Sequence, residues 1–262
     1  MTDDPLRVTR DGAVLEVVLD RPKANAIDAA TSRRMGELFA GFRDDPDLRV
    51  AIVTGGGDRF FSAGWDLKAV AAGDIRPDED YGIGGFGGLQ ELPGLNKPVI
   101  AAVNGIAVGG GFELALSADL ILAAEHARFA LPEINAGTLA DAATIKLPRR
   151  IPYHVAMDLL YTGRWMEAAE AARWGLVNQV VPAAALMDRV RALARHLADG
   201  PPLVFAAIKE VARESEAMPV QAALARVMRR GFPTVAALYA SDDQLEGARA
   251  FAEKRKPVWK GR

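Results

Sequence analysis

The chain has 262 residues, no cysteine and a formal net charge of −2, and half of its residues are hydrophobic. These values are typical of a globular protein long enough to bury a stable core, and they exclude disorder, collagen and any site that needs a cysteine ligand or nucleophile. A charge so close to neutrality provides no overall field for nucleic acid.

The location and ligands of the protein are constrained by what the sequence lacks. The N-terminus is acidic and has no apolar stretch of the kind found in signal peptides. The longest uncharged apolar run, between Lys97 and Glu113, is too short and too rich in glycine to span a membrane. The three histidines have no metal-ligand spacing. We therefore predict a cytoplasmic protein that binds no nucleic acid, membrane or metal.

Strands and helices are predicted to alternate over the first two-thirds of the chain. A β-branched run predicts a strand over residues 13–19, and Asp28 then has the position of a helix N-cap. Apolar residues follow it at helical spacing: Met35, Leu38, Phe39 and Phe42. Further strands are predicted at 50–54, 98–103, 119–123 and 127–130. Because these runs are continuous rather than alternating, we expect an α/β fold whose strands are covered on both faces.

The last third of the sequence is predicted to be almost wholly helical. One helix is expected over residues 183–198, ended by Gly200, Pro201 and Pro202, and two or three more should follow. We therefore predict an α/β core over residues 1–195 and a helical region over 196–262.

A G-x-G-x-x-G pattern occurs at residues 82–87. In a dinucleotide-binding site this pattern follows a strand and opens a helix, but here the acidic segment 77–81 precedes it. A glycine-rich loop is the better interpretation, and a dinucleotide oxidoreductase remains only a remote alternative.

Two glutamates lie in unusually apolar surroundings. Glu113 follows the glycines 109–111, which should open a helix and present unpaired backbone N–H groups to a ligand. Glu133 follows a predicted strand, 20 residues further on, so both side chains can reach one pocket. Burial should raise the pKa of such a carboxyl group, and two of them in a dry pocket suit general acid–base catalysis. The structural alternative is that Glu113 caps a helix and Glu133 starts one.

A second glycine-bearing segment, residues 60–68, follows the strand at 50–54. A strand, a loop and a helix start would again present backbone N–H groups. Two such segments can supply two donors to one oxygen, which stabilises a developing oxyanion by about 2.7–4 kcal/mol per donor.

These segments together resemble the crotonase (enoyl-CoA hydratase/isomerase) superfamily, and the resemblance extends over essentially the whole chain. The motifs that carry it occur in the family's order: Phe60–Leu67, Lys97–Gly105, Gly109–Ala115 and Phe129–Glu133. The resemblance implies a crotonase (ClpP-like) spiral of ββα units with a helical C-terminal oligomerisation region. It also implies homotrimers or homohexamers and an acyl-coenzyme A substrate, with no permanently bound cofactor.

The resemblance also implies roles for individual residues. Glu113 and Glu133 would be the catalytic acid–base pair, and the backbone N–H groups of Ala63 and Gly110 would form the oxyanion hole. The residues expected to bind the substrate and its CoA are Lys23, Ala24, Ala26, Ser62, Ala63, Gly64, Trp65, Asp66, Leu67, Gly109, Gly110 and Lys254. Lys254 would reach CoA phosphates, either within one chain or in a neighbouring subunit.

The implied reaction is the reversible hydration of an enoyl thioester. Residues 20–28, Trp65 and the tail 257–262 resemble those of family members that act on carnitinyl-CoA, which implies that this substrate loses water to form crotonobetainyl-CoA. Trp65 and Tyr81 have aromatic faces that suit its trimethylammonium group, although Trp65 equally suits packing near the CoA adenine. A general enoyl-CoA hydratase or isomerase remains an alternative.

One segment departs from the family pattern. Residues 136–144 have Ala140 where the family's hydratases usually carry proline, and they lack the glycine pair that follows it. The added methyl groups would crowd the pocket beside the catalytic water, and a small misplacement can cost about 100-fold in rate. The sequence therefore also allows a reshaped acyl pocket or a catalytically impaired CoA-binding homologue.

Overall fold

The computed structural model describes residues 4–66 and 80–262. The described residues form three sheets. In the largest, the strand order is β1-β2-β4-β7-β9-β12, with β1 antiparallel to β2 and the other neighbours parallel. Its strands are β1 (Leu6–Asp11), β2 (Val14–Leu19), β4 (Val50–Gly55), β7 (Val99–Val103), β9 (Leu120–Ala124) and β12 (Gln179–Val181).

The second and third sheets are smaller and lie next to the glycine-rich segments. The second has the order β11-β10-β8-β5 and the third pairs β3 with β6 in parallel. Their strands are β3 (Ala26–Ile27), β5 (Phe60–Ser62), β6 (Gly64–Trp65), β8 (Ile106–Val108), β10 (Arg128–Ala130) and β11 (Met166–Glu167).

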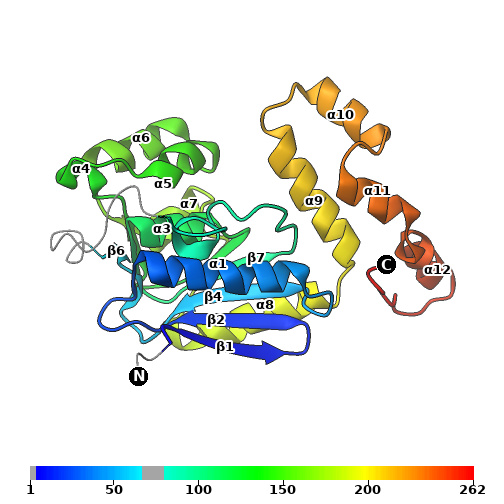
Figure 1. Ribbon diagram of the computed structural model, residues 1–262, viewed down its shortest axis with the longest axis horizontal. Coiled ribbons are helices and arrows are strands. Elements are labelled where there is room, and N and C mark those ends of the chain that lie inside the picture. The colour runs from blue at the N-terminus through cyan, green and yellow to red at the C-terminus, as the bar shows by residue number, and fades with distance from the viewer. Residues whose placement is uncertain (1–3, 67–79) are drawn as a thin grey trace.

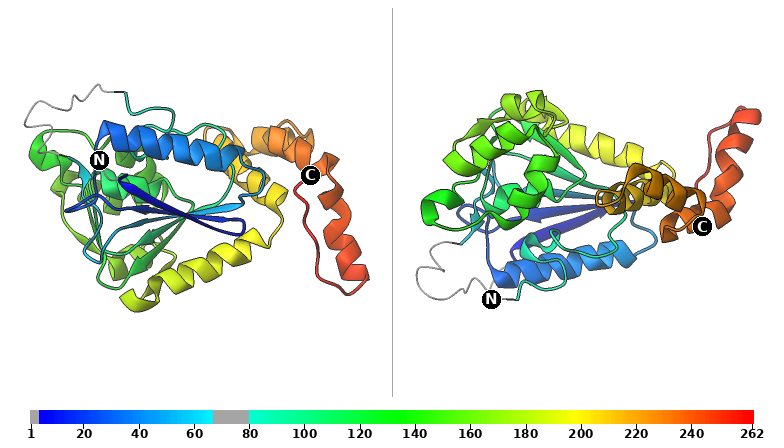
Figure 2. Two further views of the ribbon diagram at one scale, coloured as in Figure 1. Left: turned by 60° about the horizontal axis from the view of Figure 1, so that its bottom comes forward. Right: turned by 90° about the horizontal axis from the view of Figure 1, so that it is seen from above.

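Helices α1 and α8 cover opposite faces of the large sheet (Figure 2). The N-cap prediction is confirmed, because the Asp28 carboxylate accepts a hydrogen bond of 2.7 Å from Thr31 N–H at the start of α1 (Ala29–Asp44). Met35, Phe39 and Phe42 on that helix are buried. Every residue of β4 and β7 is buried, which confirms strands covered on both faces.

The remaining helices surround this core. They are α3 (Gly110–Leu116), α4 (Glu133–Ala136), α5 (Asp141–Lys146), α6 (Tyr153–Thr162), α7 (Ala168–Arg173), α8 (Leu186–Ala198), α9 (Pro202–Ser215), α10 (Val220–Met228), α11 (Pro233–Ala240) and α12 (Glu246–Ala252). Short 3-10 helices occur at η1 (Phe86–Gly88), η2 (Leu147–Arg149), η3 (Ala183–Ala185) and η4 (Asp242–Leu245).

The C-terminal arm, which comprises α9 to α12, extends away from the sheets (Figure 1). It has four α-helices where the sequence predicted two or three. The reason is that Pro219 caps α10 and Pro233 opens α11, so one apolar stretch becomes two helices. The predicted boundary after residue 195 falls inside α8, and the division into a core and an oligomerisation region stays a prediction.

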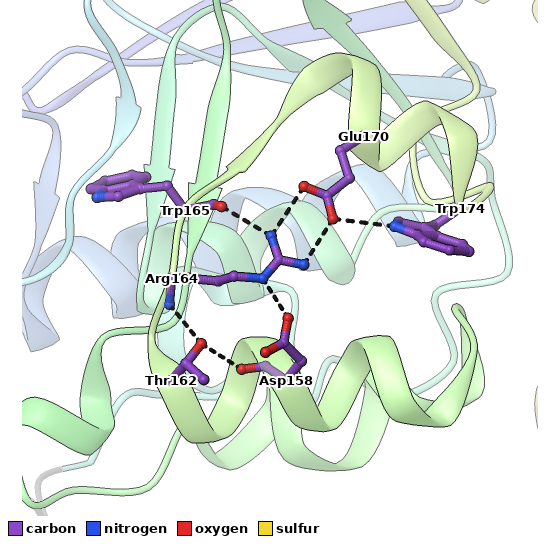
Figure 3. A network of polar contacts seen from close by, with 6 residues as sticks. All are labelled: Asp158, Thr162, Arg164, Trp165, Glu170 and Trp174. Carbon is purple, nitrogen blue, oxygen red and sulfur yellow. Dashed lines mark hydrogen bonds and ion pairs between the residues drawn. The ribbon is translucent and has the colours of Figure 1, made fainter.

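A cluster of polar contacts fastens α6 to α7 (Figure 3). The guanidinium of Arg164 donates two hydrogen bonds to the carboxylate of Glu170, at 2.8 and 3.0 Å, and a third to Asp158 on α6. Trp174 Nε1 also donates to Glu170, at 3.3 Å. A forked pair of this kind fixes geometry more firmly than a single ion pair does.

Among the described residues, no helix is long and apolar enough to cross a bilayer.

Candidate functional site

The site is built around the start of α3. Strand β8 leads into Gly109, which adopts a positive φ of 56° and lets the chain turn abruptly into the helix. Within the described part of the chain, the N–H groups of Gly110 and Gly111 have no hydrogen-bond acceptor. These are the unpaired donors that the sequence predicted at this helix start.

The second glycine-bearing segment lies directly against the first. A Cβ on Gly64 would lie 2.6 Å from the backbone nitrogen of Gly110 and 2.9 Å from that of Gly111. Only a residue without a side chain allows two backbones to approach so closely. The structure therefore brings together the two segments proposed to hold one oxygen. The helix start expected after this segment lies outside the described residues.

The predicted second donor, the N–H of Ala63, has a partner within the chain. It donates a hydrogen bond of 2.9 Å to the carbonyl of Ala24, and its role in the oxyanion hole stays a prediction. The N–H of Gly64 donates to the hydroxyl of Ser62, which in turn donates to the carbonyl of Asn25. The side chain of Ser62 is fully buried, and its hydroxyl holds the loop itself together.

Glu113 is buried on α3, and both of its carboxylate oxygens accept hydrogen bonds. Oε1 accepts from the backbone N–H of Ala143, at 2.9 Å, and Oε2 accepts from Gln90 Nε2, at 3.3 Å. Burial raises the pKa of Glu113, and the two donors act against that rise. Glu113 thus also binds the N-terminal turn of α5, as the structural alternative suggested.

Glu133 opens α4 beside the same glycines. Its Oε1 lies so close to Gly109 that a Cβ added to this glycine would be only 2.8 Å from that oxygen. Its Oε2 is buried and has no hydrogen-bond partner among the described residues. Burial raises the pKa of Glu133 to about 7, with smaller contributions from the charges of Glu113 and Asp141. The two carboxyl groups are close enough for the charge of Glu113 to raise the pKa of Glu133, but they differ in their hydrogen-bond partners.

The turn of chain between the glutamates explains why they meet. Strand β10 returns parallel to β8, with Ala130 paired to Val108, so the residues that follow each strand emerge at the same edge. Gly109 N–H also donates to the carbonyl of Ala130, at 3.0 Å. The 20-residue separation in the sequence is closed by this pairing.

The segment that departs from the family pattern contributes to the site through its backbone. Ala140 and Ala143 are buried, and the N–H of Ala143 holds Glu113. Sequence reasoning missed this donor and Gln90. A backbone N–H has no sequence signature, and Gln90 lies 23 residues from its acceptor, beyond any local pattern.

The remaining predicted binding residues are distributed as follows. Ala26 pairs with Gly64 in the parallel ladder of β3 and β6, and Lys23 is exposed on the preceding turn. Asp66 forms an ion pair with Arg21, at 3.0 Å, and Leu67 lies outside the described residues. Trp65 has a buried indole nitrogen without a partner among the residues described.

Lys254 is separated from all of these residues within one chain. It follows α12, which lies at the far end of the molecule from β6 (Figure 1). The structure therefore does not bring Lys254 to the site of its own chain.

A buried carboxyl pair beside unpaired backbone donors is typical of enzymes that use acid–base chemistry on a carbonyl compound. The comparison with family models matches residues 9–262 to the enoyl-CoA hydratase/isomerase family. The chain belongs to this family, and the predicted crotonase fold is confirmed.

Individual relatives agree with this assignment over the full length. A carnitinyl-CoA dehydratase from Citrobacter koseri is 55% identical over 260 residues, and one from Salmonella paratyphi A is 56% identical over 264 residues, each covering 99% of both chains. The crystal structure of an enoyl-CoA hydratase from Mycobacterium tuberculosis superposes with a TM-score of 0.89 at 38% identity, covering 99% of this chain and 100% of that one.

Proposed function

We propose that the protein catalyses the reversible dehydration of carnitinyl-CoA to crotonobetainyl-CoA and water. The observation that carries this proposal is the meeting of Glu113 and Glu133 beside the unpaired N–H groups of α3. The high identity to carnitinyl-CoA dehydratases supports the choice of acyl group. Coenzyme A enters as part of the substrate, and the proposed steps use no resident cofactor.

In the hydration direction, the thioester oxygen binds the N–H of Gly110. This contact withdraws electrons from the conjugated double bond, makes C3 electrophilic and stabilises the enolate that forms. Ala63 N–H can serve as the second donor only if it gives up its hydrogen bond to the carbonyl of Ala24 and donates to the thioester oxygen instead.

The two glutamates divide the proton transfers. Glu113 accepts two hydrogen bonds that favour its ionised form, so it is suited to take a proton from water as the oxygen attacks C3. Glu133, with a pKa of about 7, is largely protonated below neutrality and delivers a proton to C2. Dehydration runs the same steps in reverse.

The test follows the loss of the conjugated enoyl-thioester absorbance with crotonobetainyl-CoA and crotonyl-CoA side by side. We expect turnover of both, with a clear preference for crotonobetainyl-CoA. A preference for crotonyl-CoA would indicate a general enoyl-CoA hydratase. Coenzyme A binding without turnover of either compound would indicate the impaired homologue that the altered segment 136–144 allows.

Substitution separates the glutamate mechanism from mere folding effects. Glu113→Gln and Glu133→Gln should each remove most turnover while leaving coenzyme A binding intact, whereas Glu125→Gln, at an exposed position after β9, should change neither. In water labelled with heavy oxygen, hydration places the label on C3 and isomerisation incorporates none. An unchanged rate in either active-site variant would refute the two-glutamate mechanism.

The proposed assembly is a homotrimer or a homohexamer. It is supported by large apolar side chains that the C-terminal arm leaves exposed in one chain: Val220, Leu224, Met228, Tyr239 and Phe251. Packing of this arm against another copy would also bring Lys254 towards the CoA phosphates of a neighbouring site. Sedimentation velocity tests the proposed assembly, and a monomer at micromolar concentration would contradict it.

The cytoplasmic location also remains a prediction.

A further inference from the structure

An aromatic pair lies against the start of α3 and takes no part in the proposed proton transfers. The rings of Tyr81 and Phe86 meet edge to face, with centroids 5.7 Å apart. Phe86 opens the 3-10 helix η1, and its ring lies over Gly110, because a Cβ on that glycine would be only 2.4 Å from Phe86 Cε1. The pair therefore lies beside the backbone donor proposed to hold the thioester oxygen.

The length of the proposed acyl group matches this position. In crotonobetainyl-CoA, four bonds of about 1.5 Å separate the thioester carbon from the quaternary nitrogen, a span of roughly 5 Å when extended. A cation interacts favourably with an aromatic face when it lies within about 6 Å of the ring centroid. An acyl group anchored at Gly110 therefore has its cationic end within reach of a ring that already contacts Gly110.

The charged groups near the start of α3 also suit a cation. Glu133 lies against Gly109 and has one buried oxygen without a partner among the described residues. The charged groups that act on Glu133 are the carboxylates of Glu113 and Asp141, and both raise its pKa. A permanently cationic acyl group would relieve the repulsion among these carboxylates, whereas a neutral acyl group would not.

We propose that Tyr81 and Phe86 receive the trimethylammonium group of the substrate through cation–π contacts and so select cationic over neutral acyl groups. This inference rests on the proposed function. It names the part of the site that determines the acyl specificity, which neither the fold nor the two glutamates determine.

The experiment compares crotonobetainyl-CoA with 5,5-dimethylhex-2-enoyl-CoA, in which a carbon atom replaces the quaternary nitrogen. The two acyl groups have nearly the same shape and differ in charge. The readout is the ratio of their kcat/KM values, measured from the loss of enoyl-thioester absorbance with the full-length protein. Loss of one π face should lower this ratio by about 5- to 30-fold.

Three variants and one control make the measurement specific. Phe86→Leu and Tyr81→Leu should each lower the ratio, and Tyr81→Phe, which keeps the aromatic face, should preserve it. Tyr153→Leu removes another edge-paired aromatic ring, on the exposed surface of α6, and should leave the ratio unchanged. If Phe86→Leu fails to fold, the two Tyr81 variants still test the proposal.

The outcomes separate this inference from the proposed function. A wild-type protein that turns over crotonobetainyl-CoA, with leucine variants that keep its ratio, would overturn the aromatic selection alone. A wild-type protein that hydrates crotonyl-CoA but leaves crotonobetainyl-CoA untouched would overturn the proposed substrate and this selection together.

Discussion

Replacing Gly64 with alanine tests whether the contact between β6 and α3 organises the site. The new Cβ would lie 2.6 Å from Gly110 N and 2.7 Å from the carbonyl oxygen of Val108, about 0.8 Å closer to the nitrogen than an ordinary contact. Both atoms belong to the backbone, so no flexible side chain can move aside. The φ of +74° adds about 1–2 kcal/mol of strain for alanine, and overpacking adds about 1–3 kcal/mol.

Gly57 provides the matched control for this substitution. Its φ is +76°, but an added Cβ would meet nothing within 4 Å. Gly57→Ala should therefore cost only the backbone strain and leave activity intact. Gly64→Ala should be less stable than Gly57→Ala by about 1–3 kcal/mol in urea denaturation. It should also lose about 100-fold in kcat/KM, because the thioester donor shifts by nearly 1 Å.

The comparison has a clear adverse result. If Gly64→Ala matches Gly57→Ala in stability and keeps wild-type turnover of enoyl-CoA, then the approach of the two backbones is not required. The assignment of the site to the start of α3 would then be refuted.

Three further predictions concern the polar groups. Because burial raises the pKa of Glu133 to about 7, activity that needs its protonated form should fall as pH rises through 7. For the same reason, the free energy of unfolding should fall as the pH rises from about 4.5 to 7. In denaturant titrations, Glu133→Gln should remove this pH dependence. Gln90→Leu removes a donor that lowers the pKa of Glu113, so the acidic limb of the pH–rate profile should move to higher pH; an unmoved limb would contradict the role of Gln90. Arg164→Lys keeps the charge but loses the fork to Glu170, and Tm should fall by about 2–4 °C; an unchanged Tm would indicate that the cluster adds no stability.

Much of the fold was predictable because its determinants are local. The continuous apolar runs of β4 and β7 indicated strands buried on both faces, and Asp28 indicated where α1 begins. The number of helices in the C-terminal arm was underestimated, because each proline there starts a new helix rather than ending the region.

The site was only partly predictable, for a different physical reason. Glu113 and Glu133 stand out in sequence because a carboxylate in an apolar run must be buried or paired. The pairing partners cannot be found that way. Gln90 and Ala143 reach Glu113 through tertiary packing, and the N–H of Ala63 is occupied by a carbonyl 39 positions earlier in the chain, that of Ala24.

We expect the altered segment 136–144 to be compatible with catalysis, because it contacts the two glutamates unequally. Ala143 presents its N–H, not its side chain, to Glu113, so alanine at this position still provides the donor. Glu133 receives no such donor at its Oε2 from the described residues, and burial therefore dominates its pKa. A hydrogen-bonded carboxylate and a poorly solvated carboxyl group are suited to opposite proton transfers. In the proposed mechanism, the difference between base and acid thus arises because the start of α5 lies close to Glu113 and donates to it.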